Sequence, residues 1–251
     1  MIFIAFVLIF NSQMQNKRKE MSFIETYEHK EDFQKYKKQP KNIYVRSLQI
    51  KLKHIINVNL NGNLVIEDKK FHLIASSILG KEIDIGINEN ELWYWAKRSK
   101  PKGLYYSKLE NINKTNLKSA LNPNWIMTSF GLNFKKNDKS EILLSGDSII
   151  ILNKDINHLG ENNTIVTIID KKTEIILGNY LYNNFGKLVA SSEIKEYQKI
   201  KDYILPKIIF IMWKDEGINM EWTLNDIVVD LNVNDNAWNR PNIYPSINIG
   251  K

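Results

Sequence analysis

The four histidines of this chain are its most versatile residues for catalysis and metal binding, and their spacing excludes the common helical metal pair. They are His29, His54, His72 and His158, and no two lie three or four residues apart, the spacing that places two ligands on one helix face. His54 and His72 fall on segments that could pair in a hairpin, but no third zinc ligand accompanies them. Ordinary hydrogen-bonded histidines are therefore the favoured interpretation, and we expect no metal site.

Carboxylates and glycine motifs make no stronger case for catalysis. A carboxylate pair for glycoside hydrolysis would have to come from Asp84, Glu91, Asp226 or Asp230, which fall near strand ends where solvent normally surrounds such groups. No nucleophile elbow, phosphate-binding loop or dinucleotide fingerprint occurs, and the chain has no cysteine. We therefore expect a protein that is not an enzyme and needs no cofactor.

The aromatic run Trp93-Tyr94-Trp95 precedes Lys97 and Arg98 and has the composition of a binding surface. Stacking against single-stranded bases is one use of such a run. Core packing with an aromatic lining is favoured, because the alternation of a strand places Trp93 and Trp95 on one face and Tyr94 on the other. Six tryptophans in all suit a large apolar cavity better than a catalytic cleft.

The formal net charge of +7 is spread along the chain, with residues 17–19 and 35–41 as its dense basic patches. Lys, Asn and Ile are abundant together and share AT-rich codons, so coding bias explains the charge without a function. Attraction to an anionic membrane surface is the functional alternative. We expect no nucleic-acid partner and a monomeric protein.

Residues 2–10 (IFIAFVLIF) are nine consecutive apolar residues. This run is about half the ~20 residues needed to span a bilayer, and it matches the apolar part of a secretory signal, although no basic residue precedes it and no small-x-small site follows. A buried strand or helix end is the alternative. We interpret residues 1–15 as an export signal, and we expect residues 16–251 to form a single domain in the periplasm or at the outer membrane.

From Ile43 onward, apolar and polar residues alternate as they do in half-buried strands. Asn61-Gly62 predicts a tight hairpin turn, and residues 183–186 predict a longer one. Residues 204–213 are apolar at both parities, which predicts cover on both faces, and the parity switch after Asp226 predicts a bulge.

About ten or eleven strands follow from this alternation, in an antiparallel meander without crossover helices. The predicted strands are residues 44–58, 64–78, 83–87, 91–97, 141–144, 148–152, 164–170, 174–182, 187–197, 204–213 and a last strand from residue 218, with residues 105–106 as an extension of the sheet. Residues 22–38 predict an amphipathic helix that Pro40 ends. Asn122-Pro123 predicts the start of a second, short helix, with Trp125, Ile126, Ser129 and Phe130 on one face.

Several segments resemble, in the same order, the LolA/LolB-like group of periplasmic lipoprotein carriers and outer-membrane lipoprotein-sorting proteins. They are VRSLQIKLK (45–53), LNGNLVIEDKKFHLIA (60–75), EIDIGINENELWYWAKR (82–98), LNPNWIMTSFGL (121–132) and LPKIIFIMW (205–213). The likeness covers roughly residues 43–241 and is greatest to uncharacterised lipoproteins of this superfamily. This chain departs from the carriers in having Glu67-Asp68-Lys69 where they have a basic residue and a proline. It also lacks the lipidated cysteine of the lipoprotein members.

This resemblance implies a mainly β fold, a half-open antiparallel β-barrel whose helices lid an apolar concave face that shelters acyl chains. We expect non-enzymatic binding of acyl chains, lipids or lipoproteins in the bacterial envelope, with residues 123–130 as the lid. The alternative is a structural or interaction protein of the envelope whose core is filled by its own side chains. Candidate cavity residues are Trp93, Trp95, Trp125, Ile126, Phe130, Phe210, Met212, Met220 and Trp222.

Overall fold

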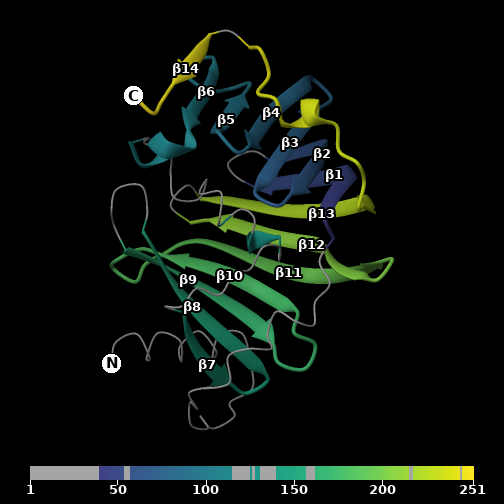
Figure 1. The fold of residues 1–251 in the computed structure, drawn as a ribbon, viewed down its shortest axis with the longest axis vertical. Helices are drawn as coiled ribbons and strands as arrows, with labels where there is room; N and C mark the ends of the chain where they lie inside the picture. The colour runs from purple at the N-terminus through teal and green to yellow at the C-terminus, as the bar shows by residue number, and fades with distance from the viewer. Residues whose placement is uncertain are drawn as a thin grey trace.

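The computed structural model contains one curved, unclosed sheet of fourteen strands (Figure 1). It describes residues 40–53, 57–114, 125, 128–130, 140–156, 162–214, 217–243 and 245–251. The predicted export signal (1–15), the predicted helix at 22–38 and His54 lie outside the described residues. The mainly β class is confirmed.

The strands are more numerous than the ten or eleven predicted. They are β1 (Asn42–Lys53), β2 (Val58–Glu67), β3 (Lys70–Ser77), β4 (Gly80–Ile87), β5 (Glu91–Ala96), β6 (Leu104–Lys108), β7 (Glu141–Ser145), β8 (Ser148–Ile156), β9 (Asn162–Asp170), β10 (Ile176–Tyr182), β11 (Leu188–Ile200), β12 (Tyr203–Trp213), β13 (Ile218–Val229) and β14 (Ser246–Asn248). Within the described ranges they are accompanied by the 3-10 helices η1 (Leu109–Lys114) and η3 (Asp235–Trp238).

Two meanders form the sheet, and they join where β1 pairs with β13. The order across the sheet is β14-β6-β5-β4-β3-β2-β1-β13-β12-β11-β10-β9-β8-β7. The β1–β13 register runs from Ile43 opposite Val229 to Lys53 opposite Asn219. Neighbouring strands are antiparallel, as predicted, except that β14 pairs parallel with β6.

One face of the sheet, which we call the core face, carries the main buried cluster. Alternate residues of β1, β2, β3, β8, β9, β10, β11, β12 and β13 contribute to it. On β13, Met220, Trp222 and Leu224 belong to this cluster before Asp226, and Ile227 and Val229 belong to it afterwards. Asp226 has a left-handed φ of 44°. The predicted parity switch is therefore present, but the predicted bulge is not seen against β1. Asn225 is opposite Ser47 and Ile227 is opposite Val45 in one unshifted register, because the core-facing residues of β1 change parity at the same point.

The predicted turn at Asn61-Gly62 is wrong, because both residues lie within β2. A Cβ on Gly62 would lie 2.1 Å from the carbonyl oxygen of Ile74 on β3, so this glycine permits a close approach of two strands. The turn that was missed follows Glu67, where Asp68 has φ 49° and reverses the chain into β3. This missed turn divides one predicted strand into two.

The back face, opposite the core face, is covered unevenly. Ile150, Leu152, Val166, Ile168, Tyr180 and Tyr182 form a second buried cluster on β8, β9 and β10. On β12, Ile204 is 44% exposed and Phe210 is 38% exposed. The prediction that β12 is covered on both faces is therefore wrong for these two side chains.

The C-terminal segment (residues 231–251) crosses the back face and ends beside β6. After β13 it runs past β3, β4 and β5 with η3 at its centre, and β14 then adds to the sheet (Figure 1). At the start of this segment, Asn42 of β1 donates from Nδ2 to the Leu231 carbonyl oxygen (2.6 Å) and accepts from the Leu231 amide (2.9 Å). Among the described residues, no helix is long and apolar enough to span a membrane.

Substituting Gly62→Ala should lower the free energy of unfolding by about 2 kcal/mol, because the added Cβ forces β2 away from the Ile74 backbone. Urea unfolding followed by circular dichroism measures this loss. Asn59→Ala, at an exposed position of the same strand, is the matched control. Equal stability of the two variants would contradict the close packing of β2 on β3.

Candidate ligand-binding face

Large aromatic side chains from distant parts of the chain meet on the core face. Phe130 lies with its ring centroid 5.4 Å from that of Trp222 on β13 and 6.3 Å from that of Phe71 on β3. Trp125 joins the same cluster and is 1% exposed. An aromatic surface of this kind offers a large apolar area with few polar groups, as binding sites for apolar ligands do.

The segment that supplies Trp125 and Phe130 is fastened to the sheet through its backbone. Trp125, Thr128 and Ser129 have helical backbone geometry, and the Ser129 hydroxyl donates to the Trp125 carbonyl oxygen (2.7 Å). The Thr128 carbonyl oxygen accepts from Nδ2 of Asn179 on β10 (2.7 Å). The remaining residues of the predicted lid, 123, 124, 126 and 127, lie outside the described residues, so the lid helix remains a prediction.

Three polar side chains lie side by side in the otherwise apolar core face. Thr167 of β9 is opposite Asn179 of β10, which is opposite Ser192 of β11, and all three are fully buried. The Thr167 hydroxyl donates to Oδ1 of Asn179 (2.8 Å). Within the described part of the chain, Oγ of Ser192 and Nε1 of Trp222 are buried without a hydrogen-bond partner.

Sequence reasoning did not single out Thr167, Asn179 or Ser192. The signal was present in principle, because each is a polar residue at the core-facing parity of an apolar strand. The alternation alone could not show that three such positions fall in one row. That alignment depends on the register of β9, β10 and β11.

The structure places the nine predicted cavity residues on different faces. Trp125, Phe130, Met220 and Trp222 are in the core-face cluster, and Ile126 lies outside the described residues. Trp93 and Trp95 are opposite Gly86 and Asp84, and Phe210 and Met212 are opposite Glu193 and Ser191, all on the back face. The parity of each pair was predicted, but the face it points to follows from the curvature of the sheet.

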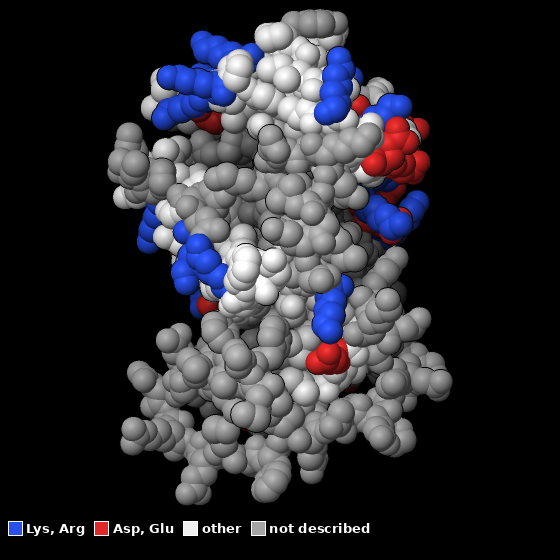
Figure 2. All heavy atoms as spheres, turned by 90° about the vertical axis from the view of Figure 1, so that its left-hand side faces the viewer, with Lys and Arg blue, Asp and Glu red and all other residues white. Residues whose placement is uncertain are grey.

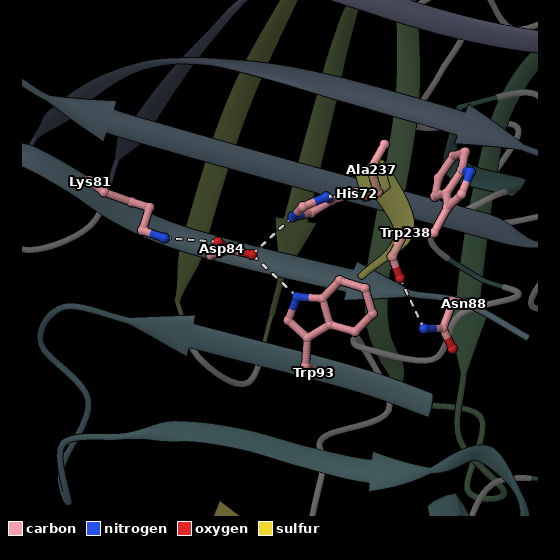
Figure 3. Close-up of polar contacts among 7 residues, drawn as sticks. All are labelled: His72, Lys81, Asp84, Asn88, Trp93, Ala237 and Trp238. Carbon is pink, nitrogen blue, oxygen red and sulfur yellow. Dashed lines mark hydrogen bonds and ion pairs between the residues drawn. The ribbon is translucent and has the colours of Figure 1, made fainter. Parts of the chain in front are cut away.

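Trp93 belongs to a polar cluster on the back face of β3, β4 and β5 (Figure 3). Its Nε1 donates to Oδ1 of Asp84 (3.2 Å), which also contacts Nε2 of His72 (3.0 Å). Lys81 Nζ donates to the other carboxylate oxygen (2.9 Å). The indole ring lies against Gly86, where a Cβ would be 2.0 Å from it, so only glycine leaves room for this ring.

The same cluster fastens the C-terminal segment (Figure 3). Nδ1 of His72 lies 2.7 Å from the Ala237 carbonyl oxygen, and Nδ2 of Asn88 donates to the Trp238 carbonyl oxygen (3.0 Å). Farther along, Arg240 pairs with Glu91 (3.3 Å) and lies over the Tyr106 ring. These contacts hold η3 and the residues after it against the sheet.

The Asp84 and His72 contacts give this cluster a structural role. Burial alone would raise the pKa of Asp84, but hydrogen bonds from His72 and Lys81 lower it below its usual value. A carboxylate and a carbonyl both accept, so each ring nitrogen of His72 has to donate for both of its bonds to form. Both residues thus make contacts within the fold itself.

Two of the other carboxylates considered for catalysis, Glu91 and Asp230, are also engaged in the fold. Glu91 pairs with Arg240, and Asp230 accepts from the Tyr203 hydroxyl (2.7 Å) and the Lys41 amide (2.8 Å). No group of three or more metal-ligating side chains occurs among the described residues.

Comparisons with solved structures identify the fold. A DUF1329 family protein from Desulfovibrio piger is 12% identical with TM-score 0.56, covering 80% of this chain and 90% of its own. A putative outer membrane lipoprotein-sorting protein domain from Vibrio parahaemolyticus is 13% identical with TM-score 0.55, covering 83% and 93%. A LolA superfamily protein from Nitrosomonas europaea is 10% identical with TM-score 0.53, covering 81% and 92%.

This chain therefore has a LolA-like fold, as the sequence resemblance implied. The half-open sheet agrees with that class, and at these identities the likeness concerns the fold alone. No family model matches the sequence. No curated protein matches it either.

Substituting Asp84→Asn should lower the free energy of unfolding by about 2 kcal/mol at pH 7, because His72 and Lys81 lose a charged partner. The lowered pKa of Asp84 stabilises the folded state above the pKa of the unfolded chain, about 4, and this contribution is lost as pH falls through the folded pKa. The difference in free energy of unfolding between wild type and Asp84→Asn should therefore become smaller as the pH falls below about 4.

Urea unfolding at pH 7, 5 and 3 measures this dependence. Glu89→Gln, at an exposed turn position, is the control and should change little. A difference between wild type and Asp84→Asn that does not change with pH would contradict an ionised, hydrogen-bonded Asp84.

Proposed function

We propose that this protein binds the acyl chains of lipids or lipoproteins on its core face, in the bacterial envelope and without catalysis. The observation that carries the proposal is the pair Trp125 and Phe130, which belong to the buried core-face cluster. The Phe130 ring lies against the rings of both Phe71 and Trp222. The fold is shared with a putative lipoprotein-sorting protein domain. We infer that the part of the chain carrying Trp125 and Phe130 acts as a lid in the place of the ligand.

Binding is then an exchange of one apolar occupant for another. An acyl chain of ~14 carbons gains on the order of 10 kcal/mol from burial, at about 0.8 kcal/mol per methylene, before ordering costs. Displacing Trp125 and Phe130 returns their surface to water and offsets part of that gain. The net affinity is therefore moderate and reversible, which suits a protein that has to release its cargo.

An exported protein of this class would act in the periplasm or at the outer membrane. The apolar run at residues 2–10 supports this placement through its length and composition.

A structural or interaction role in the envelope is the second candidate. One observation favours it: Phe71, Phe130, Trp125 and Trp222 already fill the described part of the core face with side chains of the protein itself. Under this alternative the segment at 125–130 is part of a permanent core, and no lipid replaces it.

Substituting Phe130→Ala should raise affinity for a fluorescent fatty acid about fivefold, because the segment gives up two aromatic contacts and leaves the core face more easily. Phe210→Ala, on the back face, is the matched control and should leave affinity unchanged. Displacement titration and native mass spectrometry of the purified protein make the measurement. No bound lipid in either variant or the wild type would favour the filled-core alternative.

One rim of the sheet presents apolar side chains that fit a membrane surface. Ile78 is fully exposed and Leu79 is 70% exposed at the β3–β4 turn, and Phe185 is 85% exposed at the β10–β11 turn, which lies at the same ends of the strands. Exposed side chains of this size at turn tips are typical of contact sites.

Basic residues surround the first of these tips. Lys97 donates to the Leu79 carbonyl oxygen (2.8 Å), and Lys81 and Arg98 are nearby in the strands and loop that follow. Figure 2 shows Lys and Arg side chains gathered at the upper end of the molecule, at the height where Figure 1 places β4, β5 and β6. This combination suits an anionic bilayer, in which the aliphatic tip inserts and the cations contact headgroups.

Replacing both Ile78 and Leu79 by serine should weaken partitioning onto vesicles of phosphatidylglycerol and phosphatidylethanolamine about tenfold, through lost insertion of two aliphatic side chains. Vesicle co-sedimentation measures the partitioning of each protein onto the vesicles. Ile204→Ser, at an exposed apolar position on the opposite rim, is the control. If the double variant and Ile204→Ser lost vesicle partitioning equally, or if neither lost any, this rim would be excluded as the membrane contact.

A further inference from the structure

The row Thr167–Asn179–Ser192 is a polar feature in a face that is otherwise built to exclude water. All three side chains are fully buried, and they come from adjacent strands of one register. Buried polar groups are normally hydrogen-bonded, because leaving one without a partner costs free energy. Within the described residues, the Ser192 hydroxyl has no such partner. The row is therefore only partly satisfied in this structure.

Thr167 determines the direction in which the Asn179 amide points. Oδ1 of Asn179 can only accept, so the Thr167 hydroxyl is the donor in the 2.8 Å bond between them. The amide nitrogen then faces away from β9 and donates to the Thr128 carbonyl oxygen at 2.7 Å. The apolar face thus contains an oriented N–H donor, and the acceptor that it holds in this structure is a carbonyl oxygen.

Beyond the row, the floor of the core face is apolar again. Ser192 is opposite Ile211 on β12, which is opposite Met220 on β13, and Trp222 is the next core-facing residue on β13. The segment at 125–130 has the same polarity, since its Thr128 carbonyl lies at Asn179 while its Phe130 ring lies at Trp222. A molecule with a carbonyl at one end of a hydrocarbon chain reproduces this arrangement.

We propose that Asn179, oriented by Thr167, and the neighbouring Ser192 form a recognition point for the carbonyl oxygen of an acyl ester or acyl amide. The Thr128 carbonyl occupies this point when residues 125–130 lie on the core face. The hydrocarbon chain then runs from Asn179 towards Trp222 and Phe71. This inference rests on the proposed function and adds to it the class of ligand, an acyl chain that retains its carbonyl, over a plain hydrocarbon or an ether.

A matched pair of lipids isolates the carbonyl. Palmitoyl lysophosphatidylcholine and its hexadecyl ether analogue share headgroup and chain length and differ in the carbonyl oxygen alone. Each is titrated into the full chain below its critical micelle concentration, with tryptophan fluorescence or calorimetry as the readout. An N-palmitoyl peptide is the third ligand. The tighter of the two carbonyl ligands then shows whether the group is a lipid ester or a protein-linked amide.

Wild type should bind at least one carbonyl ligand about tenfold more tightly than the ether. Asn179→Leu should bring that ratio to about one and also strengthen ether binding, because the Thr128 carbonyl loses its partner. Ser192→Ala should reduce the ratio severalfold. Ser191→Ala, the neighbouring position on the back face of the same strand, should leave it unchanged. Circular dichroism of each variant establishes that it is folded.

Three outcomes overturn the proposal in different ways. Equal binding of ester, amide and ether by wild type removes the carbonyl point and leaves acyl binding intact. A preference that survives in both Ser192→Ala and Asn179→Leu places recognition elsewhere. Binding of none of the three ligands by wild type removes the proposed function itself, and the inference with it.

Discussion

The pairing of β1 with β13 is the contact on which the rest of the fold depends. Each meander, β1–β6 and β7–β13, has an apolar face of its own. The pairing of β1 with β13 brings residues of both meanders into one buried cluster. The left-handed Asp226 keeps the core-facing residues of β13 on one side along the whole seam. Asn42, hydrogen-bonded to both backbone groups of Leu231, holds the end of that seam where the C-terminal segment departs. Because this contact joins strands that are far apart in the sequence, residues 42–53 and 218–229, its formation requires the closure of a long loop, which slows folding.

The two faces of the sheet differ in how completely their buried polar groups are hydrogen-bonded. On the back face, both oxygens of Asp84 and both ring nitrogens of His72 make hydrogen-bonding contacts. One of these contacts, from His72 to the Ala237 carbonyl oxygen, holds η3 against the sheet. On the core face, Asn179 holds one backbone carbonyl and Ser192 holds nothing among the described residues. A fully paired network makes a rigid attachment, whereas a partly paired one leaves donors for another molecule. This contrast distinguishes the side of the sheet that is closed from the side proposed to open.

The two segments laid over the sheet differ in the same sense. The C-terminal segment is held by ion pairs, side-chain hydrogen bonds and a parallel strand pairing with β6. The described residues at 125–130 contact the sheet through the apolar side chains of Trp125 and Phe130 and through the hydrogen bond from Asn179 to the Thr128 carbonyl oxygen. Apolar contacts have no directional requirement, so an acyl chain can replace them without leaving polar groups unpaired. The C-terminal segment is therefore attached through directional polar contacts. The contacts at 125–130 are of the kind that the proposed acyl ligand could replace.

Much of this fold was determined by the sequence alone. The period-two alternation specified a mainly β antiparallel protein, the parity switch marked the irregular position at Asp226, and the order of its segments specified the LolA-like class. Local pattern could not show that Gly62 lies within a strand, because a glycine needed for close strand approach looks the same as one needed for a turn. Nor could it decide which face Trp93 and Trp222 would occupy, since alternation fixes their parity and only the curvature of the assembled sheet distinguishes inside from outside. The row of Thr167, Asn179 and Ser192 was decided by tertiary structure entirely, because it exists only when three strands pair in one register.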